Sequence, residues 1–193
     1  HLLDKFRDAA ETRSVVFSPP ERHADFRSAI VDAWILCPQV AGDLGLRMQT
    51  FFQQQLDSPA MSNRIVIIGA DCPQLSTVDI ESAFAALDDH DAVIGPSTDG
   101  GYYLLGMREK CVNVFEDIEW STGEVFAKTL AALKQANASH KTLAPRTDVD
   151  DRESLQQLLD RLANTPDKKL ACLRNAIHEA LGEQIDNQNM GPS

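Results

Sequence analysis

The sequence predicts an α/β protein, a three-layer α/β/α sandwich around one open and mostly parallel sheet. Short apolar runs alternate along the chain with longer segments whose apolar residues recur at helical spacing. The most apolar short run, residues 64–69, shows no polar alternation, as expected of a central strand that is covered on both faces. The 193 residues suit one such domain, which we expect over residues 1–182 with a polar tail at 183–193.

The first part of the chain is expected to hold three helices and one strand. It opens in a helical pattern, because the apolar residues among the first ten share one helical face. Residues 14–17 fit a short buried strand that ends at a proline pair, and helices are expected over about 21–31 and 44–56. Because a parallel sheet normally begins with a strand, we expect that the first strand of the fold is missing.

The rest of the chain alternates strands with helices. After the strand at 64–69, Ser76 and Asp79 have the spacing of a capping box at the start of a helix. The next elements in order are strands at 91–96 and 102–107, a helix at about 123–136, a strand at 141–144, a helix from Asp150 to Leu162, and a last helix that begins at Thr165.

Composition narrows the classes of function. The charged residues give 18 − 29 = −11, and so acidic a surface repels phosphate backbones and anionic lipids, so neither nucleic acid nor membrane is an expected partner. The four cysteines are scattered and form no C-x-x-C pair, which favours reduced thiols and a cytoplasmic location. The chain has no G-x-S-x-G elbow, no G-x-G-x-x-G fingerprint and no G-K-[ST] phosphate loop, which argues against hydrolase, dehydrogenase and P-loop functions.

An acidic loop follows the most apolar strand. Asp71 comes two residues after Gly69, and open α/β sheets bind ligands beyond the carboxyl ends of their strands. An ionised carboxylate there is costly unless it is paired or coordinates a cation, and Mg²⁺ or Mn²⁺ would bridge it to a diphosphate. Asp71 is therefore a candidate metal ligand, and the alternative is an aspartate that caps a turn or the next helix.

A second candidate loop is Asp99-Gly100-Gly101-Tyr102. Two adjacent glycines let a backbone approach phosphate or sugar oxygens closely, and Asp99 could position or deprotonate an acceptor hydroxyl. Asp-Gly and Gly-Gly are also common in hairpin turns, so an ordinary turn is the alternative.

A third acidic segment follows the strand at 141–144. Asp150 and Asp151 suit the N-terminus of the next helix, which explains them without any function. Asp148 is less easily explained in this way. Because a parallel sheet would bring this segment to the same edge as Asp71, we consider Asp148 and Asp150 candidate metal ligands.

Three further residues are candidates for substrate binding. Trp120 precedes a helix and could form a stacking platform for a base or a sugar, whereas Ser121 or Thr122 could simply cap that helix. Arg47 lies in the first turn of a helix, where a cation is unfavourable unless an acid or a ligand phosphate is near.

Five motifs occur in order along the chain. They are Gly42-Asp43-Leu44-Gly45-x-Arg47-Met48, Gly69-x-Asp71-Cys72-Pro73, Gly95-Pro96-x-x-Asp99-Gly100-Gly101-Tyr102-Tyr103-Leu104-x-Gly106, Glu119-Trp120-Ser121 and Thr147-Asp148-Val149-Asp150. Their order and spacing resemble an uncharacterised bacterial transferase family with a GT-A-like fold, over about Asp4 to Leu162. The family has been described as radical-SAM/selenodomain-associated transferases, and some members as arsenosugar-biosynthesis glycosyltransferases.

The resemblance implies a nucleotide-diphospho-sugar transferase fold in which Asp71 binds the metal. It places Asp99, Gly100 and Gly101 along the donor or acceptor site, and Asp148 and Asp150 match a late acidic element of related nucleotidylyltransferases. Such proteins usually begin with a strand and a Gly/Lys/Arg-containing loop that grips the nucleotide phosphates. Nothing in this sequence matches that loop, so either the chain is N-terminally truncated, which we favour, or that function is lost.

The expected function is a metal-dependent transfer from a nucleotide-sugar donor to a small-molecule acceptor. Asp71 and Asp99 would be the catalytic residues, with Gly100, Gly101, Tyr102, Trp120, Ser121 and Arg47 contacting the substrates. A nucleotidylyltransferase that releases pyrophosphate, and a noncatalytic binding module on the same fold, are the alternatives.

Overall fold

The computed structural model describes residues 5–30, 34–58, 63–147, 149, 152–164, 171–172 and 174–179. The chain divides into two compact units. One is Leu2–Asp148, and the other consists of His1 with Val149–Ser193. The prediction of a single domain over residues 1–182 stays a prediction.

A small parallel sheet forms the first part of the larger unit. It pairs β1 (Ser14–Phe17) with β2 (Ile35–Pro38), and η1 (Pro20–Arg22) and α2 (His23–Ala29) lie between them in the chain. The predicted strand at 14–17 is confirmed. The strand β2 was not predicted, although its sequence is a short apolar run that ends at a proline.

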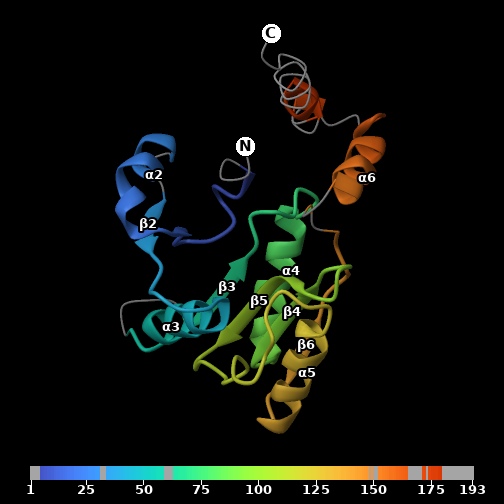
Figure 1. The fold of residues 1–193 in the computed structure, drawn as a ribbon. Coiled ribbons are helices and arrows are strands. Elements are labelled where there is room, and N and C mark those ends of the chain that lie inside the picture. Colours follow the sequence, from blue (N-terminus) through green and yellow to red (C-terminus); the bar gives the residue numbers. More distant parts are fainter. Residues whose placement is uncertain are drawn as a thin grey trace. The chain divides into compact units, whose positions relative to one another are not determined.

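Four strands form the main sheet in the order β3-β5-β4-β6 (Figure 1). They are β3 (Arg64–Ile68), β4 (Ala92–Pro96), β5 (Tyr102–Arg108) and β6 (His140–Thr142). β5 runs antiparallel to both of its neighbours, while β4 and β6 are parallel, so β3, β4 and β6 share one direction. β5 reverses direction because only a tight turn separates it from β4, and a tight turn can join antiparallel strands but not parallel ones.

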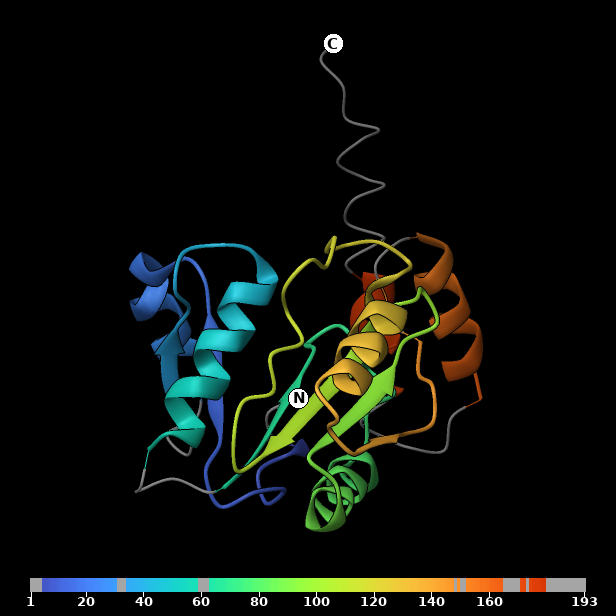
Figure 2. The same ribbon diagram turned by 90° about the horizontal axis from the view of Figure 1, so that it is seen from below.

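Helices cover both faces of the main sheet, as the sequence predicted. α4 (Thr77–Asp89) packs on one face with Val93 and Leu104, whereas α3 (Leu44–Leu56) and α5 (Val125–Gln135) pack on the other with Ile94 and Leu105 (Figure 2, α4 in green and α5 in yellow). The apolar positions of β3 alternate between the two cores, since residues 65 and 67 face α3 and residues 66 and 68 face α4.

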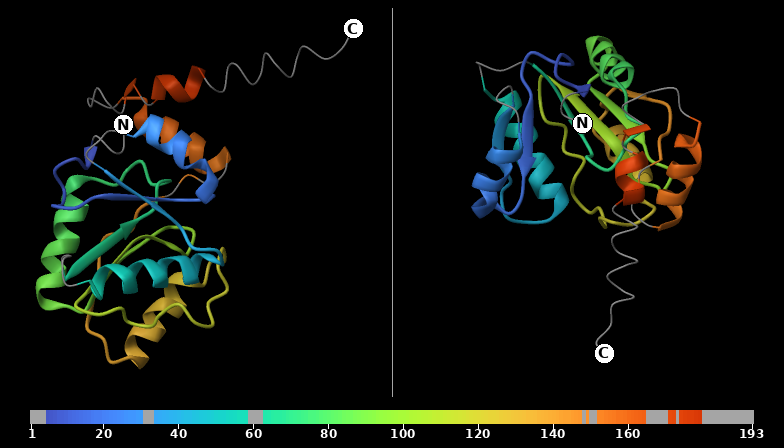
Figure 3. Two further views of the ribbon diagram at one scale, coloured as in Figure 1. Left: turned by 90° about the vertical axis from the view of Figure 1, so that its left-hand side faces the viewer. Right: turned by 90° about the horizontal axis from the view of Figure 1, so that it is seen from above.

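Both helices that follow the first two motifs begin at capped residues. Asp43 accepts a hydrogen bond from the N–H of Leu46 at 2.8 Å at the start of α3. Ser76 and Asp79 form the predicted capping box of α4. These caps fix where the two helices begin, and hence where the loops before them end (Figure 3, left).

β3 lies at an edge of the main sheet and pairs only with β5 among the described strands. Each of its five residues remains half-buried, although β3 is the most apolar strand by sequence. The N–H of Gly69 donates to the carbonyl of Tyr103 at 2.9 Å, so in this antiparallel pair the N–H groups of Ile65 and Ile67 also face β5. Those of Val66 and Ile68 face the opposite side.

The smaller unit contains α6 (Arg152–Leu162) and helical residues at 171–172 and 174–179. Leu158, Leu159 and Leu162 form its buried apolar side. The guanidinium of Arg174 donates to the carbonyl of Ala163 at 2.9 Å, close to the end of α6. The predicted start of the last helix at Thr165 lies outside the described residues. In the described part of the chain, no helix combines the length and apolarity needed to cross a bilayer.

Candidate functional site

Three loops meet at the end of the main sheet where β3, β4 and β6 reach their last residues. We call this end of the sheet the rim, and it consists of residues 69–76, 97–101 and 143–147. It forms because the three strands run in the same direction and therefore end on the same side. Backbone hydrogen bonds tie two of the loops together, from Thr98 N–H to the carbonyl of Arg146 and from Arg146 N–H to the carbonyl of Pro96, each at 3.0 Å.

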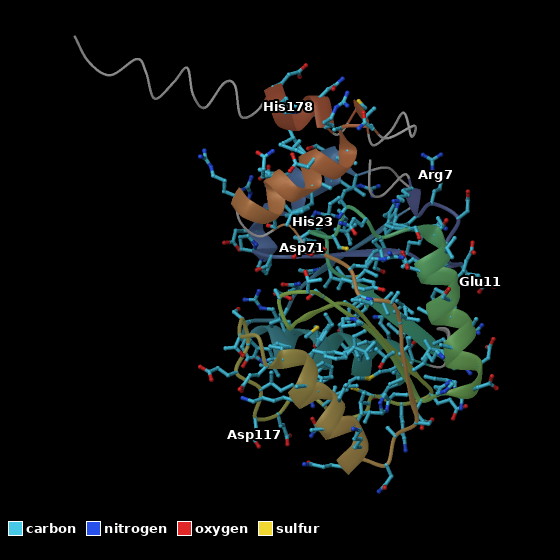
Figure 4. The ribbon with its side chains drawn as sticks, turned by 90° about the vertical axis from the view of Figure 1, so that its right-hand side faces the viewer. Arg7, Glu11, His23, Asp71, Asp117 and His178 are labelled. Atoms are coloured by element: carbon cyan, nitrogen blue, oxygen red, sulfur yellow. The ribbon has the colours of Figure 1, made fainter. Side chains whose placement is uncertain are left out.

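Asp71 is an exposed carboxylate on a firmly anchored loop. The neighbouring side chains of Cys72 and Leu75 are fully buried, and the Cys72 thiol lies 3.8 Å from the carbonyl oxygen of Thr147. Gly69 gives the carboxylate its space, because a Cβ on Gly69 would lie only 2.5 Å from Asp71 Oδ1. Asp71 therefore combines an exposed charge with a fixed backbone just beyond β3 (Figure 4).

Asp99 lies in a tight turn between β4 and β5. Its Oδ1 accepts hydrogen bonds from the Ser97 hydroxyl and, at 2.8 Å, from the N–H of Gly101. Both bonds reach the same oxygen, so Oδ2 has no hydrogen-bond partner among the residues that the structure describes. The hairpin turn considered from the sequence is present, and it holds an exposed carboxylate with one oxygen available.

Gly100 brings the turn against the segment before α5. Its φ is +92°, and a Cβ on it would lie 2.1 Å from the carbonyl oxygen of Gly123. The N–H of Phe126 donates to the carbonyl of Gly100 at 2.9 Å. Only glycine combines that backbone conformation with so close an approach.

Trp120 packs against the start of α3. A Cβ on Gly45 would lie 2.6 Å from the indole Cζ2, and the ring stacks on Phe115 with centroids 6.5 Å apart. The hydroxyl of Tyr102 lies 3.8 Å from the sulfur of Met48, also on α3. The motifs around residues 45, 102 and 120 are therefore in contact, although they are far apart in the sequence.

The predicted cap of α5 by Ser121 or Thr122 is wrong. The helix begins at Val125, and its N-cap Glu124 makes no side-chain cap. Thr122 donates its hydroxyl to the carbonyl of Glu119 at 2.8 Å, and Ser121 is exposed with a φ of 64°. The segment forms its own turn before the helix, which explains why polar residues there do not mark the helix start.

Arg47 binds neutral groups of its own neighbourhood. Its Nε donates to the carbonyl of Gly42 at 2.8 Å, and its Nη1 donates to Gln39 Oε1 at 3.2 Å. With Thr50 and Phe51 of α3, these side chains line a small hollow beside the end of β2. The guanidinium thus holds the Gln39–Gly42 segment against the first turn of α3.

Two predicted metal ligands, Asp148 and Asp150, lie outside the described residues, as does Asp151. Within the described ranges, no group of three or more His, Cys, Asp or Glu side chains is arranged to hold a metal ion. The assignment of Asp71, Asp148 and Asp150 as ligands of Mg²⁺ or Mn²⁺ therefore stays a prediction.

The sequence did not reveal an ion pair that joins the rim to α4. Arg146 Nη2 donates to Asp79 Oδ1 at 2.6 Å, and Asp79 is only 7% exposed. Burial raises the pKa of the Asp79 carboxyl, but the hydrogen bonds from Arg146 and Ser76 outweigh it and hold the pKa below its usual range. Asp79 was predicted only as a helix cap, and no spacing in the sequence relates it to Arg146.

Replacing Asp79 with Asn is expected to make stability less dependent on pH. The folded-state pKa of Asp79 lies below the usual value for an aspartate, so the ionised carboxylate stabilises the fold at higher pH. This contribution is lost as the pH falls through the folded-state pKa. The difference in melting temperature between wild type and Asp79→Asn should therefore be largest near neutral pH and should shrink at acidic pH. Melting curves of both proteins from neutral to acidic pH test this prediction. A difference in melting temperature that does not change with pH would contradict it.

A family model described as "Uncharacterized protein conserved in bacteria" (DUF2064) matches residues 2–122, more than half of the chain. Comparison with curated protein sequences gave no significant match.

Solved structures share the fold. A protein of Desulfovibrio desulfuricans G20, described as a "putative nucleotide-diphospho-sugar transferase", has a TM-score of 0.82 and 27% identity over 95% of this chain and 80% of its own. Rv0371c of Mycobacterium tuberculosis H37Rv has TM-scores of 0.51, as a complex with manganese, and 0.52 in a second structure. Its identity of 16%, over 82% of this chain and 80–83% of its own, bears on the fold alone.

Proposed function

The chain belongs to the bacterial family DUF2064, and on that premise we propose that it is a metal-dependent transferase that uses a nucleotide-activated donor. The most specific form of the proposal is a glycosyltransferase that acts on a small-molecule acceptor. The observation that carries it is the rim, where exposed carboxylates on two anchored loops lie beyond the ends of parallel strands. The likeness to the Desulfovibrio protein supports a nucleotide-sugar donor.

The metal would be Mg²⁺ or Mn²⁺, bound by Asp71. Such ions are commonly held by one or two carboxylates together with waters and substrate phosphates, so a single exposed aspartate on a fixed loop suits them. Asp148 and Asp150 are proposed as further ligands on the sequence pattern alone. Rv0371c, a protein that shares the fold, has been solved as a complex with manganese. When bound, the ion would neutralise charge on the departing diphosphate.

Asp99 is proposed to act on the acceptor. Its Oδ1 is held by Ser97 and Gly101, so Oδ2 can accept a hydrogen bond from an acceptor hydroxyl. The hydroxyl oxygen forms a bond to the anomeric carbon, the bond from that carbon to the diphosphate oxygen breaks, and Asp99 takes the hydroxyl proton. The products are a glycoside and a nucleoside diphosphate.

The other predicted contacts have different structural settings. Ser121 is exposed, and the backbone of Gly100 and Gly101 lies in the turn beside Asp99, so these three are proposed to contact the donor directly. Trp120, Tyr102 and Arg47 each contact α3 or the segment before it. We propose that these three shape the site by fixing the first turns of α3 and the segment before it, and that any part of them left exposed contacts the substrate.

Binding and product analysis together test the function. A thermal-shift screen of nucleoside diphosphates and nucleotide-sugars should show stabilisation that requires Mn²⁺ or Mg²⁺. Incubation of a stabilising nucleotide-sugar with candidate acceptors should then release nucleoside diphosphate. Release of pyrophosphate from a nucleoside triphosphate would favour a nucleotidylyltransferase instead. Absence of any metal-dependent nucleotide binding would favour a noncatalytic module. The radical-SAM and arsenosugar associations, and a cytoplasmic location, stay predictions.

A further inference from the structure

Hydrogen bonds attach the segment after β6, residues 143–147, to β4, to the turn with Asp99 and to β5. Leu143 N–H donates to the carbonyl of Ile94 at 2.9 Å, and Arg146 exchanges backbone hydrogen bonds with Pro96 and Thr98 at 3.0 Å each. The Tyr103 hydroxyl donates to the carbonyl of Ala144, also at 3.0 Å. These bonds attach residues 143–147 to β4 and β5, which carry the turn with Asp99.

The Arg146 side chain extends the attachment to the loop with Asp71. Its guanidinium reaches Asp79 in the first turn of α4, directly after that loop. Asp79 Oδ2 in turn accepts from the N–H of Ser76 at 2.8 Å and from its hydroxyl at 2.7 Å. Arg146 therefore connects the end of the Asp71 loop with residues 143–147 through an ordered chain of hydrogen bonds, on the same side of the sheet as the contact from Cys72 to Thr147.

Arg146 is half-buried, and its buried Nε and its buried partner constrain its geometry. Its Nε is buried without a hydrogen-bond partner among the described residues, which costs free energy. The other contacts of Arg146 must therefore favour this position. The partner Asp79 is almost fully buried, so the pair cannot be replaced by water without exposing a buried charge. A mobile surface pair would have neither property.

We propose that Arg146 is a positioning residue, which holds the Asp71 loop and the turn with Asp99 in a fixed position relative to each other. This inference rests on the proposed function, because it assigns to Arg146 an effect on the metal held by Asp71. Its guanidinium bonds to Asp79, and Asp79 bonds to Ser76 at the end of the Asp71 loop, so Arg146 would act on Asp71 through these two residues.

The test compares Arg146→Gln with Arg64→Gln. Arg64 also joins the main sheet to α4, through an ion pair with Asp88, but at the opposite end of that helix. Free Mn²⁺ is measured by electron paramagnetic resonance in a titration of each full-length chain with Mn²⁺ and a nucleoside diphosphate. Arg146→Gln should weaken Mn²⁺ affinity by about 10- to 100-fold, the range typical of residues that orient metal ligands. Arg64→Gln should leave the Mn²⁺ affinity within about threefold of the wild type, because the ion pair that it removes is distant and close to the surface. This should hold even if the two variants lose the same amount of melting temperature.

A second variant, Arg146→Lys, keeps the charge and protects the test against unfolding. A lysine cannot reproduce the planar contact with Asp79, so it should weaken Mn²⁺ affinity less than Gln but measurably. Equal affinities for the wild type, Arg146→Gln and Arg146→Lys would overturn the inference and leave the proposed function intact. A wild type that binds no Mn²⁺ with any nucleoside diphosphate would overturn both.

Discussion

Replacing Asp71 with Asn should abolish metal-dependent donor binding and turnover. The substitution removes the charge but keeps the size of the side chain, and the carboxylate is exposed, so the fold should persist. Loss of a direct ligand should cost about 100-fold or more in metal affinity, beyond the roughly 10- to 100-fold seen for residues that only orient ligands. Isothermal titration with Mn²⁺ and a nucleoside diphosphate measures the loss.

A matched control for this substitution is Asp117→Asn. Asp117 is also an exposed loop aspartate, and it lies well away from Asp71 in the same unit (Figure 4). Its φ of 58° is one that asparagine adopts readily, so the change should be neutral for the fold. Metal binding by Asp71→Asn equal to that of Asp117→Asn would remove Asp71 from the site.

Replacing Gly100 with Ala should destabilise the protein more than any other single methyl group added at the rim. The new Cβ would collide with the carbonyl of Gly123 at 2.1 Å, and the φ of +92° is unfavourable for alanine as well. Overpacking against backbone and the strained conformation together should reduce the free energy of unfolding by about 2–4 kcal/mol. Urea denaturation followed by circular dichroism measures this change.

The control adds the same methyl group on the other side of the contact. In Gly123→Ala the nearest atom to the new Cβ is the carbonyl oxygen of Asp99 at 3.3 Å, and a shift of a few tenths of an ångström relieves it. We expect a loss below about 1 kcal/mol, as for ordinary surface changes. Equal losses in the two alanine variants would show that the close approach at Gly100 is not the cause.

The sequence predicted the elements whose signals are local. Apolar runs located β1, β3, β4 and β5, and the Ser76–Asp79 spacing located the start of α4. β2 was missed, although its run of four residues is as long as that of β1 and ends at a proline. The sequence left the direction of β5 open, because the turn at Gly100 could be interpreted either as a ligand loop or as a hairpin.

Contacts between distant segments could not be predicted from one sequence. The five motifs suggested a shared site, but nothing in them indicated that Trp120 packs on Gly45 or that Arg146 pairs with Asp79. These contacts depend on the sheet order, which places residues far apart in the chain beside each other. The cap predicted at Ser121 or Thr122 failed for a local reason, because the Thr122 hydroxyl bonds to the carbonyl of Glu119 in a turn before α5.

The half-buried edge of β3 affects how the protein must be handled. The outward N–H groups of Val66 and Ile68, on an apolar strand, offer a template to which another extended chain can add. Arg64 at its first residue is the single charge on the strand, and charges on edge strands hinder such addition. We therefore expect that association between copies of the folded protein begins at this strand, and that it increases with protein concentration.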